Sequence, residues 1–454
     1  MSRLFMLGAI GSAGGGTTYW IGGFQGTSTT TIFPSQNGGH IAPDGNLVLC
    51  ASDESAGSVG SAIYRISPTG RLLWQKTISE YTIVGASVTQ TAAVSPDGNY
   101  LLIGSRDTAT TGAAISYMSY PTPTTVSWAR GLNSAGNDFV ARGLFDSSGN
   151  PYLIMQGDPV NTNSIEGTAV AKFNTSGTRQ WIRTLYNTND YAVFCNDACI
   201  DTSGNVHVCG AFLEIAAGTN DIIDFYIAKI SPTGAVSWQA RLTGTDLQGY
   251  NEYHRITTDA SGNVYAAGNG HHSTAAPEED VIVVKYNSSG SLQWQRRFNG
   301  SGSTGNVERC RAVTVKSDQS LLVATTYAES STLDHTYILN YNSSGTLLWQ
   351  RKLTNFELQD MVIDSEDNMY IIGNLERFHA CVLKLPADGT MTGTYTLFGA
   401  STAYSAGSGT QITSSFTNVT SPTVTTSTAT NLSQSSLSHT LSDLSRTYTK
   451  EGIT

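Results

Sequence analysis

Side chains that could bind a metal or a polar ligand gather in two nearby segments of the sequence. Residues 249–255 read GYNEYHR, and residues 268–280 read GNGHHSTAAPEED. Imidazole rings are the commonest metal ligands in proteins, and carboxylates complete many such sites. Histidines on a long loop are nevertheless more often solvated than functional. We therefore predict a ligand or partner site without a bound metal, formed by Tyr250, Tyr253, His254, His271 and His272.

Motifs for catalysis are missing from the rest of the sequence. It contains no nucleophile elbow, phosphate-binding loop, HExxH helix or paired zinc-ligand motif. DxSGN strings begin at Asp146, Asp201 and Asp259, but they lack the later carboxylates that a calcium loop needs. Asp, Ser, Gly and Asn are instead the residues of hairpin turns. We predict a protein without catalytic residues or a cofactor.

Tryptophan marks a repeated unit that must position these residues. The seven tryptophans are separated by 54, 54, 53, 57, 56 and 55 residues. Each later tryptophan closes a hairpin pattern such as YIAKISPTGAVSWQ or VVKYNSSGSLQWQ. A second hairpin precedes each of these, as in IDTSGNVHVCG and TDASGNVYAAG. Four strands per repeat, here named A to D, are the content of one propeller blade.

The first and last repeats indicate how the ring closes. Seven A–B hairpins can be counted, and residues 381–390 supply the seventh C strand, so the ring spans residues 17–399. Two segments could supply its last D strand, YWIGGFQG with Trp20 and TYTLFGA with Tyr395. Because closed β structures hide their edges, we predict that the N-terminal strand completes blade seven. The fold class is therefore all-β, a seven-bladed β-propeller closed by its N-terminal strand.

The repeat strings resemble known propeller families. DxSGNVYxxG and KYNSSGxLQWQR are similar to the seven-bladed repeats of bacterial surface proteins (SBBP-type) and of structural proteins of marine bacteriophages. The resemblance implies a seven-bladed propeller fold. The N-terminal segment and the Ser/Thr-rich tail resemble the ends of phage virion proteins, which implies a virion protein. The SPTGxxxW strings also resemble the tryptophan-docking repeats of quinone-dependent dehydrogenases. Those propellers usually have eight blades and an acidic, calcium-lined centre, which the sequence does not provide.

The two faces of the ring are expected to differ. The A–B and C–D turns are short and nearly invariant among the repeats, whereas the B–C loops vary widely in length and sequence. Because binding groups usually lie on variable loops, we predict recognition on the B–C and D–A face. Cations follow each tryptophan of the D strands from Trp74 onward, and others precede it by nine residues. We interpret both sets as guards against edge-to-edge aggregation.

Composition excludes several partners. The net charge of -10 and the pI near 5.2 argue against nucleic acid, which needs a concentrated basic face. Six cysteines lack the spacing of a zinc or disulfide framework, which indicates buried thiols and a reducing compartment. The apolar run from Leu4 to Ile10 is too short to span a bilayer. We therefore treat residues 1–16 as an anchoring or packing segment without membrane insertion.

Residues 400–454 form a Ser/Thr-rich extension. Composition alone indicates a linker. Leu437, Leu441, Leu444 and Tyr448, however, recur at spacings of four, three and four, which predicts one face of a helix. Such a helix would need a partner, so we predict self-association through this assembly extension, giving a homo-oligomer.

Together these features predict a non-enzymatic structural or binding protein of a bacteriophage virion. A tail-associated fibre, tip or nozzle element fits best, with other virion proteins and a host cell-surface receptor as partners. Two alternatives are a bacterial surface or secreted propeller that binds glycan or protein, and a quinone-dependent dehydrogenase-like propeller.

Overall fold

The computed structural model describes most of the ring and short segments of the C-terminal extension. The described residues are 18–24, 32–53, 60–78, 91–106, 112–133, 138–157, 167–186, 192–214, 222–243, 251–271, 279–300, 308–328, 334–377, 379–412, 417–419, 425–427, 433–437, 441–443 and 448–452. The predicted anchoring segment 1–16 lies outside them. All regular elements among the described residues are strands, and no helix there could cross a membrane.

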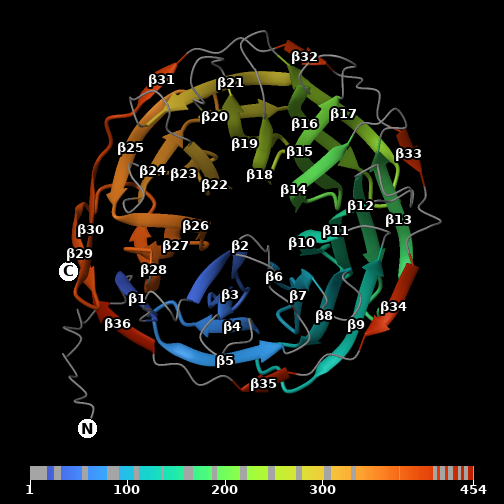
Figure 1. Ribbon diagram of the computed structural model, residues 1–454, viewed down its shortest axis with the longest axis horizontal. Coiled ribbons are helices and arrows are strands. Elements are labelled where there is room, and N and C mark those ends of the chain that lie inside the picture. Colours follow the sequence, from blue (N-terminus) through green and yellow to red (C-terminus); the bar gives the residue numbers. More distant parts are fainter. Residues whose placement is uncertain are drawn as a thin grey trace.

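Seven antiparallel sheets stand around a central axis as the blades of a propeller (Figure 1). The A strands nearest the axis are β2 (Ile32–Ile41), β6 (Thr91–Val94), β10 (Phe139–Phe145), β14 (Val193–Ile200), β18 (Glu252–Thr258), β22 (Glu308–Val315) and β26 (Phe356–Ile363). The B strands are β3 (Leu47–Asp53), β7 (Tyr100–Arg106), β11 (Pro151–Gly157), β15 (Val206–Glu214), β19 (Val264–His271), β23 (Leu321–Ala328) and β27 (Asn368–Leu375).

The outer half of each blade is a second hairpin. The C strands are β4 (Gly60–Ile66), β8 (Ala113–Ser119), β12 (Gly167–Phe173), β16 (Ile222–Ile230), β20 (Glu279–Tyr286), β24 (Asp334–Tyr341) and β28 (His379–Pro386). The D strands of blades one to six are β5 (Leu72–Ile78), β9 (Val126–Asn133), β13 (Arg179–Tyr186), β17 (Val236–Thr243), β21 (Leu292–Asn299) and β25 (Leu347–Thr354).

The N-terminal strand β1 (Trp20–Phe24) completes blade seven, as predicted. It pairs antiparallel with β28, with Trp20 opposite Lys384 and Phe24 opposite Ala380. The competing strand β29 (Gly393–Leu397) pairs instead with β30 (Ala400–Ala406) at the edge of blade six. The ring is therefore closed between its first and last repeats.

The C-terminal extension is a belt around the ring, and the predicted helix is wrong. β30 pairs with the D strand of blade six, and the following strands add a fifth strand to blades five, four, three, two, one and seven in turn. They run in the direction opposite to the blades (Figure 1). These strands are β31 (Thr410–Ile412), β32 (Thr417–Val419), β33 (Thr425–Ser427), β34 (Ser433–Leu437), β35 (Leu441–Asp443) and β36 (Tyr448–Gly452).

The residues of the expected helical stripe are thus distributed over separate blades. Leu437 pairs in blade two, Leu441 in blade one and Tyr448 in blade seven, while Leu444 lies outside the described residues. The unpaired outer edges of the sheets supply hydrogen-bond partners for the tail backbone. An isolated Ser/Thr-rich helix has no comparable source of stability.

Local sequence explains why the hairpins form. In the A–B turn of blade three, Asp146 Oδ1 accepts hydrogen bonds from the backbone N–H groups of Ser148 and Asn150, at 3.0 and 2.8 Å. Gly149 adopts φ +78°, which glycine tolerates best. The DxSGN strings are therefore turns, as predicted. The strands that they join are buried between adjacent blades, where seven separate apolar clusters form the core.

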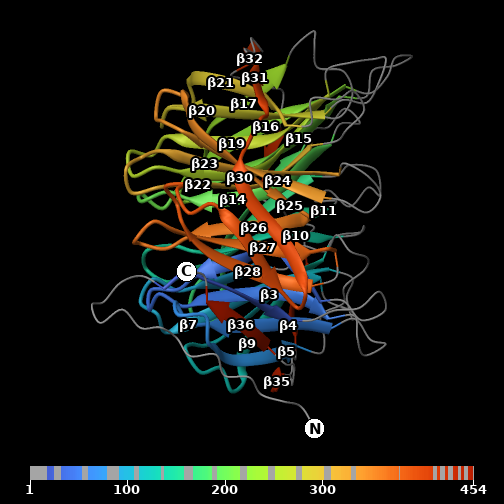
Figure 2. The same cartoon turned by 90° about the vertical axis from the view of Figure 1, so that its left-hand side faces the viewer.

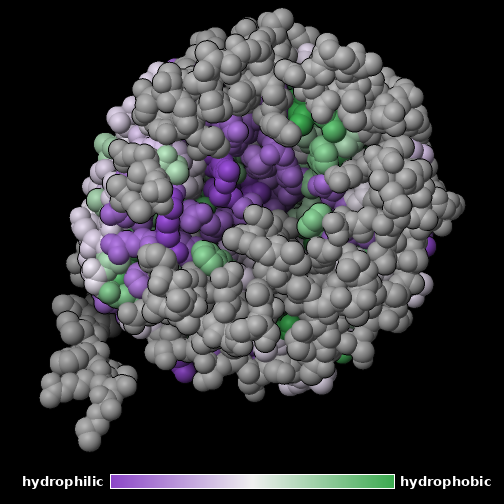
Figure 3. Space-filling model, in the orientation of Figure 1, coloured by the Kyte–Doolittle hydropathy of each residue, from purple (hydrophilic) through white to green (hydrophobic). Residues whose placement is uncertain are grey.

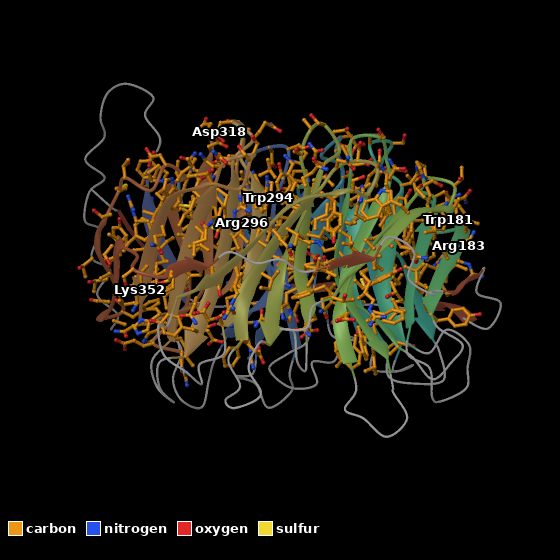
Figure 4. All side chains as sticks on the ribbon, turned by 90° about the horizontal axis from the view of Figure 1, so that it is seen from above. Trp181, Arg183, Trp294, Arg296, Asp318 and Lys352 are labelled. Carbon is orange, nitrogen blue, oxygen red and sulfur yellow. The ribbon has the colours of Figure 1, made fainter. Side chains whose placement is uncertain are left out.

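In the described contacts, the tryptophan ring packs against the C–D turn of the next blade. Trp181 Nε1 donates to the Pro232 carbonyl at 3.0 Å, and Arg183 Nε donates to the Gly234 carbonyl at 2.5 Å. The same pair of contacts joins Trp294 and Arg296 to the following turn. Figure 4 shows both pairs on the outer wall, on the side of the ring where Asp318 lies.

The cations around the tryptophans therefore have another role than the predicted one, which was to prevent edge-to-edge aggregation. Arginines two residues after the tryptophan bond to the next blade, and several cations nine residues before it pair with an A–B turn carboxylate. Lys172 Nζ lies 2.9 Å from Asp146 Oδ2, for example. The D-strand edges are instead covered by the belt.

The turns and the long connections occupy opposite faces. The A–B and C–D turns in the described part of the chain project from one face, while the strand ends that lead to the B–C and D–A connections lie at the other (Figure 2). We call the latter the loop face.

Candidate binding site at the mouth of the central channel

Charged side chains occur at one repeated position of the inner strands. Arg142, Asp197, Arg255 and Asp360 each lie four residues before the first residue of an A–B turn. A β-bulge directly precedes each of them, because the register of the A strand shifts there against the B strand. Bulges re-aim side chains at functional sites as well as in barrels. Here they place alternating positive and negative groups around the channel.

The two aspartates of this ring join neighbouring blades. Asp360 Oδ2 accepts a hydrogen bond from the Gly39 N–H at 2.9 Å, and Asp197 Oδ2 accepts one from the Ile256 N–H at 3.2 Å. Burial raises the pKa of both carboxyl groups, opposed by Arg142 and Arg255. The aspartates are thus structural links between blades seven and one and between blades four and five.

The two arginines of the ring are held by backbone carbonyl groups. Arg255 Nε donates to the Arg311 carbonyl at 2.6 Å, and one of its Nη groups donates to the His254 carbonyl at 2.7 Å. An Nη group of Arg142 donates to the Asn37 carbonyl at 3.1 Å. These guanidinium groups therefore have fixed positions in the channel wall.

A second polar layer lies at the inner-strand ends toward the loop face. His254 Nε2 is 3.5 Å from Glu252 Oε1, and Asn196 Nδ2 donates to Glu252 Oε2 at 2.9 Å. Burial lowers the pKa of His254 to about 4, so its imidazole is neutral at pH 7. The positive charges of Arg311 and Arg309 on the next blade also lower the pKa of His254.

Glu357 extends this layer to blade seven. Its Oε1 accepts a hydrogen bond from Gln359 Nε2 at 3.0 Å, and it is the main charge partner of Arg311. We call Glu252, His254, Arg309, Arg311 and Glu357 the mouth cluster. The cluster comes from blades five, six and seven.

The channel is hollow on the loop face. Figure 3 shows hydrophilic residues gathered in a central depression on this face. Deeper in the channel, a cavity of about 380 Å³ is lined by residues of the inner strands, including the four members of the charged ring. Apolar Ile41, Leu144 and Ile363 line this cavity together with polar His40, Thr257 and Thr314. A polar mouth above a cavity of mixed polarity has room for a small ligand with one charged end.

The predicted site residues occupy different environments. His254 lies in the mouth cluster, whereas the Tyr253 side chain is wholly buried and packs on Phe225, with ring centroids 4.6 Å apart. His271 ends β19, where its backbone pairs with Glu279. Tyr250 and His272 lie outside the described residues, so the site as a whole stays a prediction.

The sequence contained a signal for the charged residues that the prediction omitted. The inner strands FVARGLF, VFCNDACI, EYHRITT and FELQDMVI each carry a charge at the same distance from the turn, within an otherwise mostly apolar strand. Such a charge in a buried strand indicates a polar channel. Arg311 is harder to find, because it occupies the bulge itself, one residue earlier than the others.

Metal and disulfide chemistry find no support in the described part of the chain. No group of three or more His, Cys, Asp or Glu side chains there could hold a metal ion. All six cysteines are free thiols, and all but the half-buried Cys199 are buried, which agrees with the sequence prediction.

Comparison with known proteins adds only fold similarity. No family model matches the sequence, and no curated protein matches it. The solved structure of the polysaccharide lyase Uly1 is 8% identical, with a TM-score of 0.49 over 78% of this chain and 90% of that chain. A hydrazine synthase of Kuenenia stuttgartiensis is 11% identical, with a TM-score of 0.49 over 79% and 98%.

A third structure is the β-propeller domain of the Trilobed protease from Pyrococcus furiosus. It is 9% identical, with a TM-score of 0.46 over 78% of this chain and 95% of that chain. At these identities the comparisons concern the fold alone, and the site must be interpreted from its own residues.

Proposed function

We propose that this protein is a non-enzymatic structural and binding component of a bacteriophage virion, associated with the tail. The observation that carries the proposal is the closure of the ring by the first and last described strands of its own chain. β1 lies between β28 and β36, and a tail strand covers the outer edge of each of the other six blades. Closed edges suit a particle component that must not aggregate or pair with unrelated strands.

The remaining surfaces are available for specific contacts. With its edges covered, the ring offers a flat turn face and a loop face that surrounds the polar channel mouth. Variable loops on a rigid scaffold are the usual place for recognition. In the proposal, the loop face contacts a host receptor or another virion protein, and residues 1–16 attach the ring from blade seven.

The thiols favour this proposal over a secreted bacterial propeller. Secreted proteins mature in oxidising compartments, where disulfides form. All six cysteines of this chain are free, as expected for a protein assembled inside a cell. A dehydrogenase-like propeller would need an acidic centre, whereas the charged ring here alternates arginines with aspartates.

Homo-oligomer formation through residues 400–454 is part of the proposal. The outer edges that accept the tail of the same chain would also accept the tail of a second copy, so strand exchange offers a route to assembly.

The test is the composition of purified virus particles that carry this gene. Quantitative mass spectrometry is expected to find the protein in fixed stoichiometry, and electron cryo-microscopy is expected to show its ring at the tail. An antibody fragment directed at the loop face should reduce adsorption to host cells more than one directed at the turn face. Particles that lack the protein would contradict the proposal.

A further inference from the structure

One buried charge at the channel mouth has no hydrogen-bond acceptor within the described part of the chain. Arg311 is only 8% exposed, yet its Nε has no hydrogen-bond acceptor, and no hydrogen bond in this part involves its guanidinium group. Burial lowers the pKa of Arg311 to about 10, so the group remains charged at pH 7. A buried guanidinium without an acceptor is unfavourable unless something binds it.

The guanidinium group lies among three successive inner strands. Its electrostatic neighbours are Glu357 on β26, Arg255 on β18 and Arg309 on β22. Arg311 itself occupies the bulge of β22, where the register shifts between Cys310 and Ala312. The Arg311 carbonyl accepts the Nε hydrogen bond of Arg255 at 2.6 Å, which fixes the backbone at this position.

Both nearby carboxylates already have other partners. Glu252 accepts a hydrogen bond from Asn196 and lies beside His254, while Glu357 accepts one from Gln359. Arg309 is exposed beside Arg311 and adds a second cation. Burial raises the pKa of Glu357, opposed by the charge of Arg311. Arg309 and Arg311 together place two positive charges on the blade-six side of the mouth.

We propose that the mouth cluster binds an oxyanion, the carboxylate or phosphate group of a small ligand, through Arg311. The planar guanidinium group presents parallel N–H donors that match two oxygens of such a group, and Arg309 would stabilise its charge from the solvent side. The rest of the ligand would then extend toward the cavity of about 380 Å³. This inference does not depend on whether the protein belongs to a virion.

Calorimetric titration of the full chain tests the proposal. The probes are inorganic phosphate and glucuronate, with glucose as the uncharged control. The unmodified protein is expected to bind at least one anion and not glucose, and the anion that binds distinguishes phosphate from carboxylate recognition. Arg311→Gln should weaken binding by about tenfold or more, because it removes the charged fork.

The matched control is Arg71→Gln, since Arg71 is exposed on the turn face and carries the same charge. This variant should bind the anion as the unmodified protein does. Equal binding by Arg311→Gln and Arg71→Gln, or no binding of either anion to the unmodified protein, would overturn the proposal.

Two further measurements separate ligand binding from a structural role of Arg311. The thermal midpoint of Arg311→Gln without ligand should equal or exceed that of the unmodified protein, because a buried charge without a hydrogen-bond acceptor is removed. If Arg311→Gln fails to fold, crystals of the unmodified protein soaked in selenate should show an anomalous peak beside the Arg311 guanidinium group. A lower midpoint in a folded variant, or a soaked crystal without this peak, would contradict the proposal.

Discussion

At the scale of single residues, the contact between a tryptophan and the next C–D turn requires glycine. Gly290 adopts φ +83°, and a Cβ atom there would lie 2.7 Å from Trp238 Cδ2. Gly290→Ala should therefore lower the free energy of unfolding by about 2–4 kcal/mol, through backbone strain and overpacking together. Chemical denaturation measures this difference.

Gly149→Ala is the matched control for this prediction. Gly149 adopts φ +78°, but nothing lies within 4 Å of a Cβ atom placed there. The free energy of unfolding should therefore fall only by the backbone strain, about 1 kcal/mol. Equal losses of unfolding free energy in the two variants would show that the neighbouring tryptophan does not restrict which residue the turn accepts.

The histidine of the mouth cluster predicts a pH dependence. Burial lowers the pKa of His254 to about 4, whereas the unfolded chain has the ordinary value near 6.5. Between pH 6.5 and 4 the unfolded state binds more protons, so this group lowers stability as the pH falls. Glu252, Arg255, Arg309 and Arg311 surround the ring and set the size of the effect.

His254→Gln should remove this contribution. Between pH 7 and 4.5 the variant is expected to lose about 2 kcal/mol less stability than the unmodified protein. Urea denaturation at the two pH values measures the loss. Parallel losses in both proteins would mean that His254 titrates normally in the folded state.

At the scale of elements, β36 protects the strand that closes the ring. β1 pairs with β36 from Trp20 opposite Gly452 to Phe24 opposite Tyr448. Deleting residues 448–454 leaves β1 at an open edge. Amide hydrogens of residues 20–24 should then exchange about tenfold faster or more, which corresponds to about 1.4 kcal/mol of local opening.

The outer strand of blade three provides the internal reference for this deletion. Residues 184–186 of β13 pair with β33, which the deletion retains. Their exchange should be unchanged in mass-spectrometric measurements. A general increase over both segments would instead indicate loss of the whole fold.

Element prediction succeeded where each repeat determines its own structure. The tryptophan spacing and the DxSGN and SPTG turns are local signals, and they specify the four strands of each blade. The tail lacks such signals because its strands depend on edges formed by distant residues. The central residues of β31 to β36 are 411, 418, 426, 435, 442 and 450, a period of seven to nine that matches one step per blade.

The site was predictable only in part for a related reason. His254 was selected because the neighbouring strands A and B of blade five were expected to place it on the same face as His271 and His272. The other groups of the cluster, Arg309 and Arg311 beside His254 and Glu357 beside Arg311, come from two other blades, and only the ring brings them together. Sequence spacing cannot reveal a cluster that depends on closure of the propeller.

At the scale of the whole molecule, the first and last described strands, β1 and β36, meet on blade seven and the tail encloses the remaining blades. This arrangement makes the ring cooperative, because opening one blade requires release of β1 or of the belt. It also directs partner contacts to the two faces. Both properties depend on the pairing of the tail with its own ring.

Disulfide trapping between the tail and the ring tests whether this pairing exists. Thr77 of β5 and Ser442 of β35 are register partners, and directly opposite residues of antiparallel strands lie close enough for a disulfide. Thr77→Cys combined with Ser442→Cys should give an internally cross-linked monomer on oxidation. Thr77→Cys combined with Ser435→Cys should not, because Ser435 pairs with blade two. Equal trapping of both pairs, or cross-linking of neither, would contradict this pairing, whereas cross-linked dimers would indicate that two copies have exchanged their tails.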